Sequence, residues 1–214
     1  IFNQSDSKGY YAKILMNYRG ETWGSFYGTS TTFIEFLGYP FVIFFGFSYE
    51  AVMALFSFIG FLGFIYIYIF FKENIKFRHS FLGFDLLTII CFLPNLHFWS
   101  SSFGKGSVIF FGISLFFYGL SKIRSRIIPI IIGGLIIYHV RPHVMLVILV
   151  SAAVSFIFSS RGIRISLRML ALSACFIAFF FIYRDVLTLV GIGEDEAFSE
   201  GLNLTHRAKE LTKA

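Results

Sequence analysis

Long apolar runs divided by short basic clusters constrain this chain more than any other feature of its sequence. The strongest run, Ser48 to Phe71, would be about 36 Å long as a helix, which is enough to cross about 30 Å of hydrocarbon. Five more runs follow along the chain: Phe81 to Phe98, Val108 to Leu120, Ile127 to Val140, His143 to Phe158 and Met169 to Val190. We therefore predict an all-α polytopic transmembrane helical bundle of about six spans or hairpin arms.

The composition supports lipid as the solvent for these runs. Hydrophobic residues make up 57% of the 214 residues and charged residues only 14%, whereas soluble domains carry about 25% charged residues. The net charge of +6 does not indicate nucleic acid, because Lys and Arg lie in clusters between apolar runs. Cys91 and Cys175 lie inside apolar runs and offer neither a disulfide framework nor a metal-ligand spacing.

The basic clusters predict a topology. If the apolar runs form helical hairpins, all three clusters fall on one side of the membrane, and the positive-inside rule makes that side cytoplasmic. The clusters are Lys72 to His79, Lys122 to Arg126 and Arg161 to Arg168. We predict that Lys76, Arg124 and Arg164 face the cytoplasm, whereas Ser101 and Gly193 face outward.

This topology divides the chain into three parts. Residues 1–39 form an extracytoplasmic loop with short helices, residues 40–190 the transmembrane helical region, and residues 191–214 an extracytoplasmic polar segment that includes Glu194, Asp195 and Glu196. Because the sequence begins with Ile1 and ends within a polar stretch, we expect it to be part of a longer protein.

Two of the arms are too short to cross a bilayer. Ile127 to Val140 gives about 21 Å of helix, and Phe81 to Leu93 is cut off by Pro94. We therefore expect re-entrant or broken helices, which are tolerated only where protein or a water-filled cavity satisfies the backbone. Such segments often mark a binding site.

Arg141 is the first candidate for chemistry, because a guanidinium near membrane depth is costly and matches phosphate oxygens with two hydrogen bonds. It could instead be an anchor whose side chain reaches the headgroups. Pro142 follows Arg141. His143, at the same tip, could be a hydrogen-bond donor or proton carrier, or could be a histidine at the membrane interface without a chemical role.

A polar turn before the next apolar run holds further candidates. Gly104 and Gly106 would let a ligand approach the backbone, and a helix beginning after them would favour an anion such as a diphosphate. The alternative is an aromatic belt with serines that cap the next helix. The candidate residues are His97, Trp99, Ser100, Ser101 and Lys105.

Carboxylates supply the remaining candidates. Asp6, in a polar loop on the same outer side, could act as a general base on a sugar hydroxyl, or could be a cap or turn former. Glu50 and Asp85 lie at the margins of apolar runs. The sequence contains no chelating His/Cys set, nucleotide-binding glycine loop or nucleophile elbow, so we expect no cofactor and no metal.

These residues resemble a known family. Bacterial multispan glycosyltransferases and polysaccharide polymerases contain a turn with the pattern P-S-x-x-F-W-S-S-x-x-x-K. A similar turn in this chain is Pro94-Asn95-Leu96-His97-Phe98-Trp99-Ser100-Ser101-Ser102-Phe103-Gly104-Lys105. This chain differs from the pattern at Asn95, and Gly106 stands where an acidic residue often follows the lysine. Asp6 to Tyr11 resembles the D-S-x-x-Y entry loop of such GT-C-type proteins, and Arg141-Pro142-His143 their outward arginine turn.

The resemblance implies an activity. The donor would be a polyprenyl-diphosphate-linked glycan at the outer face of the bacterial cytoplasmic membrane. Arg141, Lys105 and His143 would stabilise the leaving diphosphate, Trp99, Ser100 and Ser101 would help to bind the substrate, and Asp6 or His97 would assist the acceptor. Partners would be membrane lipid and other polysaccharide-assembly proteins. A transporter or flippase of an anionic lipid or glycolipid, or a non-catalytic subunit of a membrane assembly, would suit the same sequence.

Overall fold

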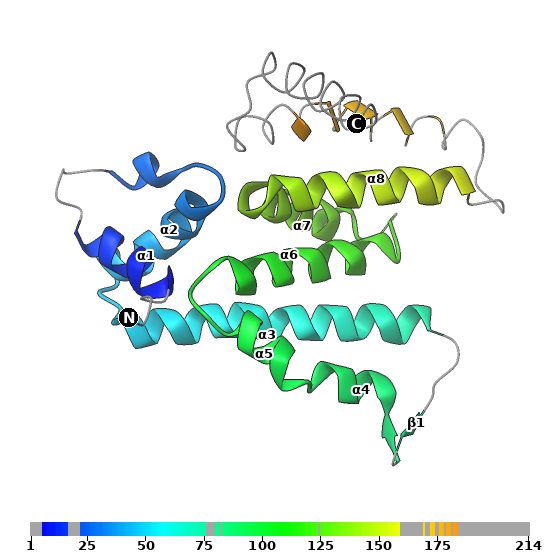
Figure 1. The fold of residues 1–214 in the computed structure, drawn as a ribbon, viewed down its shortest axis with the longest axis horizontal. Coiled ribbons are helices and arrows are strands. Elements are labelled where there is room, and N and C mark those ends of the chain that lie inside the picture. Colours follow the sequence, from blue (N-terminus) through cyan, green and yellow to red (C-terminus); the bar gives the residue numbers. More distant parts are fainter. Residues whose placement is uncertain are drawn as a thin grey trace, which may run out of the picture. The chain divides into compact units, whose positions relative to one another are not determined.

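The computed structural model describes residues 6–16, 22–75, 80–81, 83–123 and 125–158, together with scattered positions between 169 and 183. The chain forms two compact units, residues 1–141 and 142–214, and each is described by itself. The described residues are mostly helical (Figure 1), which confirms the predicted helical class. The third basic cluster, Lys76, Arg124, Cys175 and the predicted polar segment 191–214 lie outside the described residues.

The longest helix, α3 (Tyr49–Asn74), is the one described helix that is long and apolar enough by itself to cross a membrane. Ser48 caps its start by accepting a hydrogen bond from the Ala51 N–H at 3.3 Å. Only 28% of its most apolar window is buried, and Phe58 and Phe61 are more than half exposed. The described part of the chain therefore leaves most of this apolar surface uncovered.

The segment after α3 is broken, as the short arms predict. A two-stranded antiparallel hairpin, β1 (Ser80–Phe81) and β2 (Phe84–Asp85), stands where we expected a helical run to begin. Two short helices follow, α4 (Leu86–Cys91) and α5 (Pro94–Ser100). Pro94 separates them, because the residue before a proline disfavours helical backbone. The chain then bends by 108° between α5 and α6 (Lys105–Leu120), so this pair is a broken span or a re-entrant loop.

Glycines allow α6 and α7 (Ile127–Val140) to pack closely. A Cβ on Gly133 would lie 2.7 Å from the Phe116 nitrogen and 2.8 Å from the Gly112 oxygen, both of which are backbone atoms of α6. Gly63 of α3 lies similarly against Phe110 of α6. Small residues at helix contacts are typical of membrane proteins, where backbones must approach closely.

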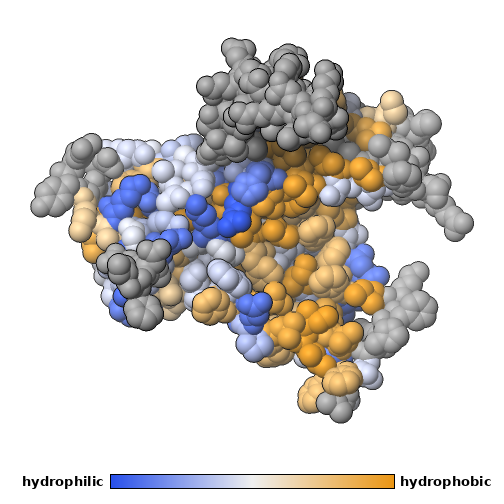
Figure 2. All heavy atoms as spheres, in the orientation of Figure 1, coloured by the Kyte–Doolittle hydropathy of each residue, from blue (hydrophilic) through white to orange (hydrophobic). Residues whose placement is uncertain are grey.

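A polar and aromatic layer precedes these helices. It consists of α1 (Asp6–Leu15), the 3-10 turn η1 (Trp23–Phe26), α2 (Thr31–Tyr39) and the π-helical turn η2 (Pro40–Phe44). Ile14, Phe26 and Ile34 are buried in its core. Figure 2 shows hydrophilic side chains over α1, α2 and the adjoining end of the helical layer, whereas hydrophobic side chains cover much of the rest.

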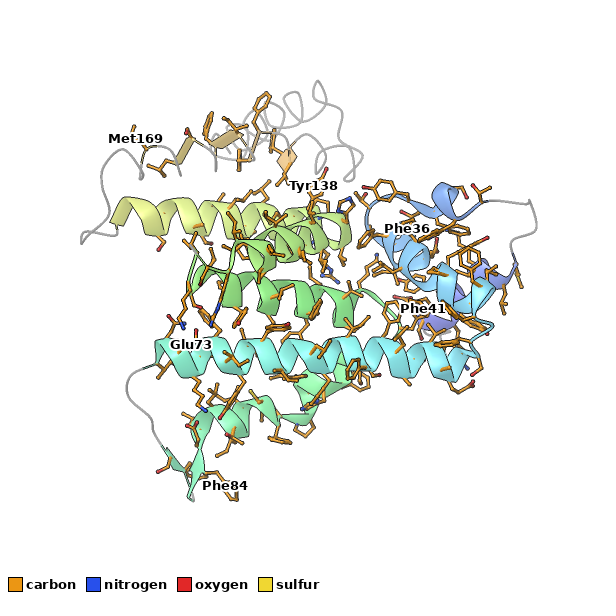
Figure 3. The ribbon with its side chains drawn as sticks, turned by 180° about the vertical axis from the view of Figure 1, so that it is seen from behind. Phe36, Phe41, Glu73, Phe84, Tyr138 and Met169 are labelled. Carbon is orange, nitrogen blue, oxygen red and sulfur yellow. The ribbon has the colours of Figure 1, made fainter. Side chains whose placement is uncertain are left out.

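The ends of the three long helices of this unit fall into two groups. The Ser7 hydroxyl lies 2.8 Å from that of Tyr49, which places α1 beside the start of α3. At the other end of α3, Glu73 contacts Lys122 and Arg126, which lie between α6 and α7 (Figure 3). The start of α6 and the end of α7 therefore lie toward the α1 layer, as paired hairpins predict. In the second unit, α8 (Pro142–Phe158) is a further apolar helix.

Candidate functional site

Lys105 joins three segments at the start of α6. Its ammonium donates a hydrogen bond to the Ser30 hydroxyl at 2.9 Å, and Ser30 lies immediately before α2. The Ser30 N–H donates to the carbonyl of His139, near the end of α7, at 2.6 Å. The hydrogen bonds therefore fix the position of the Lys105 charge relative to α2 and α7.

Arg141 ends α7 and lies within electrostatic reach of Lys105. The Arg141 backbone N–H donates a hydrogen bond of 2.8 Å to the Ile137 carbonyl at the end of the helix. Arg141 is exposed. Partial burial lowers the pKa of the Lys105 ammonium and the positive charge of Arg141 lowers it further, whereas the negative charges of Asp6 and Glu35 raise it. Because His139, two residues before Arg141, is linked through Ser30 to Lys105, the start of α6 and the end of α7 lie at the same end of the helices. We refer to Asp6, Tyr10, Glu35, Lys105 and Arg141 as the Lys105–Arg141 cluster.

Asp6 occupies the first turn of α1 and not a loop, which corrects our expectation for this stretch. The helix forms because Ser7, Tyr11 and Ile14 recur at helical spacing and face the core. Asp6 itself is exposed. Burial raises the pKa of the neighbouring Tyr10 phenol, and the Asp6 carboxylate raises this pKa further. The Tyr10 ring packs edge-on against Phe103, with ring centroids 6.0 Å apart.

Sequence reasoning missed Glu35, the buried carboxylate of the cluster. Glu35 is only 1% exposed, and its Oε2 lies 2.6 Å from the ammonium of Lys13 on α1. The Glu35 charge acts on both Tyr10 and Lys105. A signal existed in the sequence, because a carboxylate within Phe33-Ile34-Glu35-Phe36-Leu37 needs a partner if it is buried.

The serines of the predicted turn serve packing in this structure. Ser100 is buried, and its hydroxyl donates to the Leu96 carbonyl at 2.8 Å within α5. The Ser101 carbonyl accepts a hydrogen bond of 2.8 Å from the Ser57 hydroxyl of α3. Gly106, which we expected to admit a ligand, lies so close to the Trp99 carbonyl that a Cβ would clash. The Trp99 side chain itself is exposed.

The two candidate histidines are placed differently. The His97 ring stacks on Phe64 of α3, with centroids 4.3 Å apart, and its Nε2 lies 2.8 Å from the Cys91 carbonyl. These described contacts join α5 to α3 and α4, and none of them reaches α1 or α2. His143 belongs to α8 in the second unit, so its predicted role beside Arg141 stays a prediction.

The other carboxylates lie at helix starts. Glu50 occupies the first turn of α3, where negative charge is favourable, and Asp85 immediately precedes α4. Among the residues that the structure describes, no group of three His, Cys, Asp or Glu side chains could hold a metal ion. Comparison with protein-family models, curated proteins and solved structures gave no match.

Proposed function

We propose that this chain belongs to a multi-pass glycosyltransferase or polysaccharide polymerase of the bacterial cytoplasmic membrane that acts on polyprenyl-diphosphate-linked sugars. The observation that carries the proposal is the hydrogen-bond chain from Lys105 through Ser30 to His139, two residues before Arg141, which brings two cations to one end of the helices. Two like charges disfavour each other, and a dianionic ligand between them would relieve that repulsion. A diphosphate at the end of a lipid tail supplies this charge next to apolar helices.

The two cations would bind the diphosphate in different ways. The guanidinium of Arg141 can donate two parallel hydrogen bonds to phosphate oxygens, whereas the Lys105 ammonium acts as a point charge. Lys105 is already positioned by Ser30, so little ordering remains when the ligand binds. Both charges would stabilise the diphosphate as it becomes the leaving group.

Asp6 would act on the acceptor. Its exposed carboxylate would accept the proton of an acceptor hydroxyl while that oxygen attacks the anomeric carbon of the donor. The bond from the anomeric carbon to the diphosphate breaks in the same step, and the electron pair leaves on the diphosphate. The ion pair between the buried Glu35 and the half-exposed Lys13 would hold α1 and α2 together.

The test is glycosyl transfer by the purified full chain in liposomes that contain a lipid-linked sugar and an acceptor. An enzyme forms a new glycosidic bond, a flippase only moves the sugar lipid across the bilayer, and a non-catalytic subunit does neither. We expect Arg141→Lys to lower the rate of glycosyl transfer by about a hundredfold, because lysine keeps the positive charge but cannot donate two parallel hydrogen bonds. Lys8→Gln, at an exposed position of α1, is the matched control. A wild-type rate in Arg141→Lys would leave Arg141 as a membrane anchor.

A further inference from the structure

A second charged cluster lies at the opposite end of the helices from the Lys105–Arg141 cluster. Glu73, near the end of α3, accepts two hydrogen bonds from the Arg126 guanidinium, at 2.7 Å and 2.9 Å. The same guanidinium lies over the Tyr118 ring, 3.9 Å from its centroid. The hydrogen bonds to Glu73 raise the pKa of the Arg126 guanidinium, so this pair holds its charge firmly.

Lys122 is the surplus cation of this cluster. Its ammonium lies 3.1 Å from Glu73 Oε1, but its side chain is 55% exposed. An exposed ion pair contributes little, so Lys122 can turn to another anion at small cost. Glu73, Lys122 and Arg126 together carry one net positive charge, because one carboxylate faces two cations.

Lys122 also lines an open hollow of about 360 Å³ on the loop that connects α6 to α7. Among the described residues, its lining combines one cation and two hydroxyls with two aliphatic side chains: Leu120, Ser121, Lys122, Ile123 and Ser125. The Ser125 hydroxyl is free to turn, because its bond to the Lys122 carbonyl is long at 3.4 Å. The contacts with Glu73 place this hollow level with the end of α3, where a spanning helix would meet the lipid headgroups.

We propose that this hollow binds the phosphate of an anionic phospholipid. The Lys122 ammonium holds the phosphate and the Ser125 hydroxyl donates to it, while Leu120 and Ile123 contact the glycerol and the first methylenes of the acyl chains. Basic pockets between membrane helices recognise such headgroups. Binding here requires neither a sugar nor the Lys105–Arg141 cluster.

The test uses the full chain in nanodiscs of neutral phosphatidylcholine, titrated with phosphatidylglycerol. Lys122→Gln should weaken phosphatidylglycerol binding at least about tenfold, because it removes a charge-assisted hydrogen bond to the phosphate in addition to the general attraction that any exposed lysine contributes. Lys72→Gln is the matched control, because Lys72 is an exposed cation in the last turn of α3 that lies against the Tyr68 ring, outside the hollow. Equal unfolding temperatures of both variants and the wild type would show that neither change acts through folding.

Three results would overturn the proposal. Equal losses in Lys122→Gln and Lys72→Gln would mean that general electrostatic attraction, and not a site, retains the lipid. Unchanged binding in Lys122→Gln would show that the Lys122 ammonium does not bind the lipid phosphate. Inorganic phosphate that displaces phosphatidylglycerol at similar concentration would show a site for free phosphate and not for lipid.

Discussion

At the scale of single residues, the protonation of Tyr10 reports on the Lys105–Arg141 cluster. Burial and the Asp6 carboxylate both disfavour the phenolate, so the pKa of folded Tyr10 lies above the ordinary value of about 10. The folded state then holds this proton more tightly than the unfolded state. The contribution of Tyr10 to stability is therefore present below about pH 10 and is lost as the pH rises through the folded pKa.

We expect Tyr10→Phe to lose less stability than the wild type as the pH rises above about 10, because phenylalanine cannot ionise. Asp6→Asn should show an intermediate loss, since only one of the two main causes is removed. Thermal unfolding at a series of pH values measures both. Parallel curves for wild type and Tyr10→Phe would mean that Tyr10 is not in this environment.

The buried carboxylate of Glu35 gives a second prediction at this scale. Lys13→Met leaves Glu35 without its ion-pair partner, and we expect a loss of about 1–3 kcal/mol in the free energy of unfolding, since Lys13 itself is half exposed. Lys8→Met, an exposed lysine on the same helix, should change the free energy by less than about 0.5 kcal/mol. Chemical denaturation compares them, and equal effects would show that the pair contributes nothing.

At the scale of helices, the contact between α6 and α7 depends on glycine. Gly133→Ala places a methyl group against two backbone atoms of α6 that cannot move independently, and we expect a loss of about 1–3 kcal/mol. Gly9→Ala is the control, because a Cβ on Gly9 meets nothing within 4 Å. Alanine in that helix should stabilise the protein by up to about 1 kcal/mol. A neutral Gly133→Ala in thermal unfolding would contradict the close packing.

At the scale of the whole molecule, apolar runs and basic clusters were enough to predict a helical chain, the long apolar helix α3 and the break at Pro94. Hairpin pairing also predicts that the Lys105 and Arg141 tips lie at one end of the helices, and the link from Lys105 through Ser30 to His139 agrees with this, whereas a shared outward cavity stays a prediction. Glu35 and the Glu73 pair were not found, since a partner distant in sequence leaves no local pattern. The packing roles of Ser100 and Gly106 depend on tertiary contacts that spacing does not encode.

Topology is the whole-molecule property that paired hairpins predict most directly. In a variant without native cysteines, cysteine at position 8 or 101 should react with an impermeant reagent added outside intact cells, whereas cysteine at position 122 should not. The reason is that Lys122 lies at one end of the helices, whereas Ser101 and the α1 layer lie toward the other end. Labelling of position 122 from outside, together with position 101, would contradict a spanning arrangement.

The central claim is that Lys105 and Arg141 form one diphosphate site, and ligand affinity tests it most directly. The measurement is the Kd of the full chain for farnesyl diphosphate, compared among wild type, Lys105→Gln, Arg141→Gln and the control Lys8→Gln. A charge-assisted hydrogen bond contributes about 1.5–3 kcal/mol, so each cluster variant should bind at least about tenfold more weakly, and the control should match the wild type. Wild-type affinity in both cluster variants, or an equal loss in Lys8→Gln, would contradict the account.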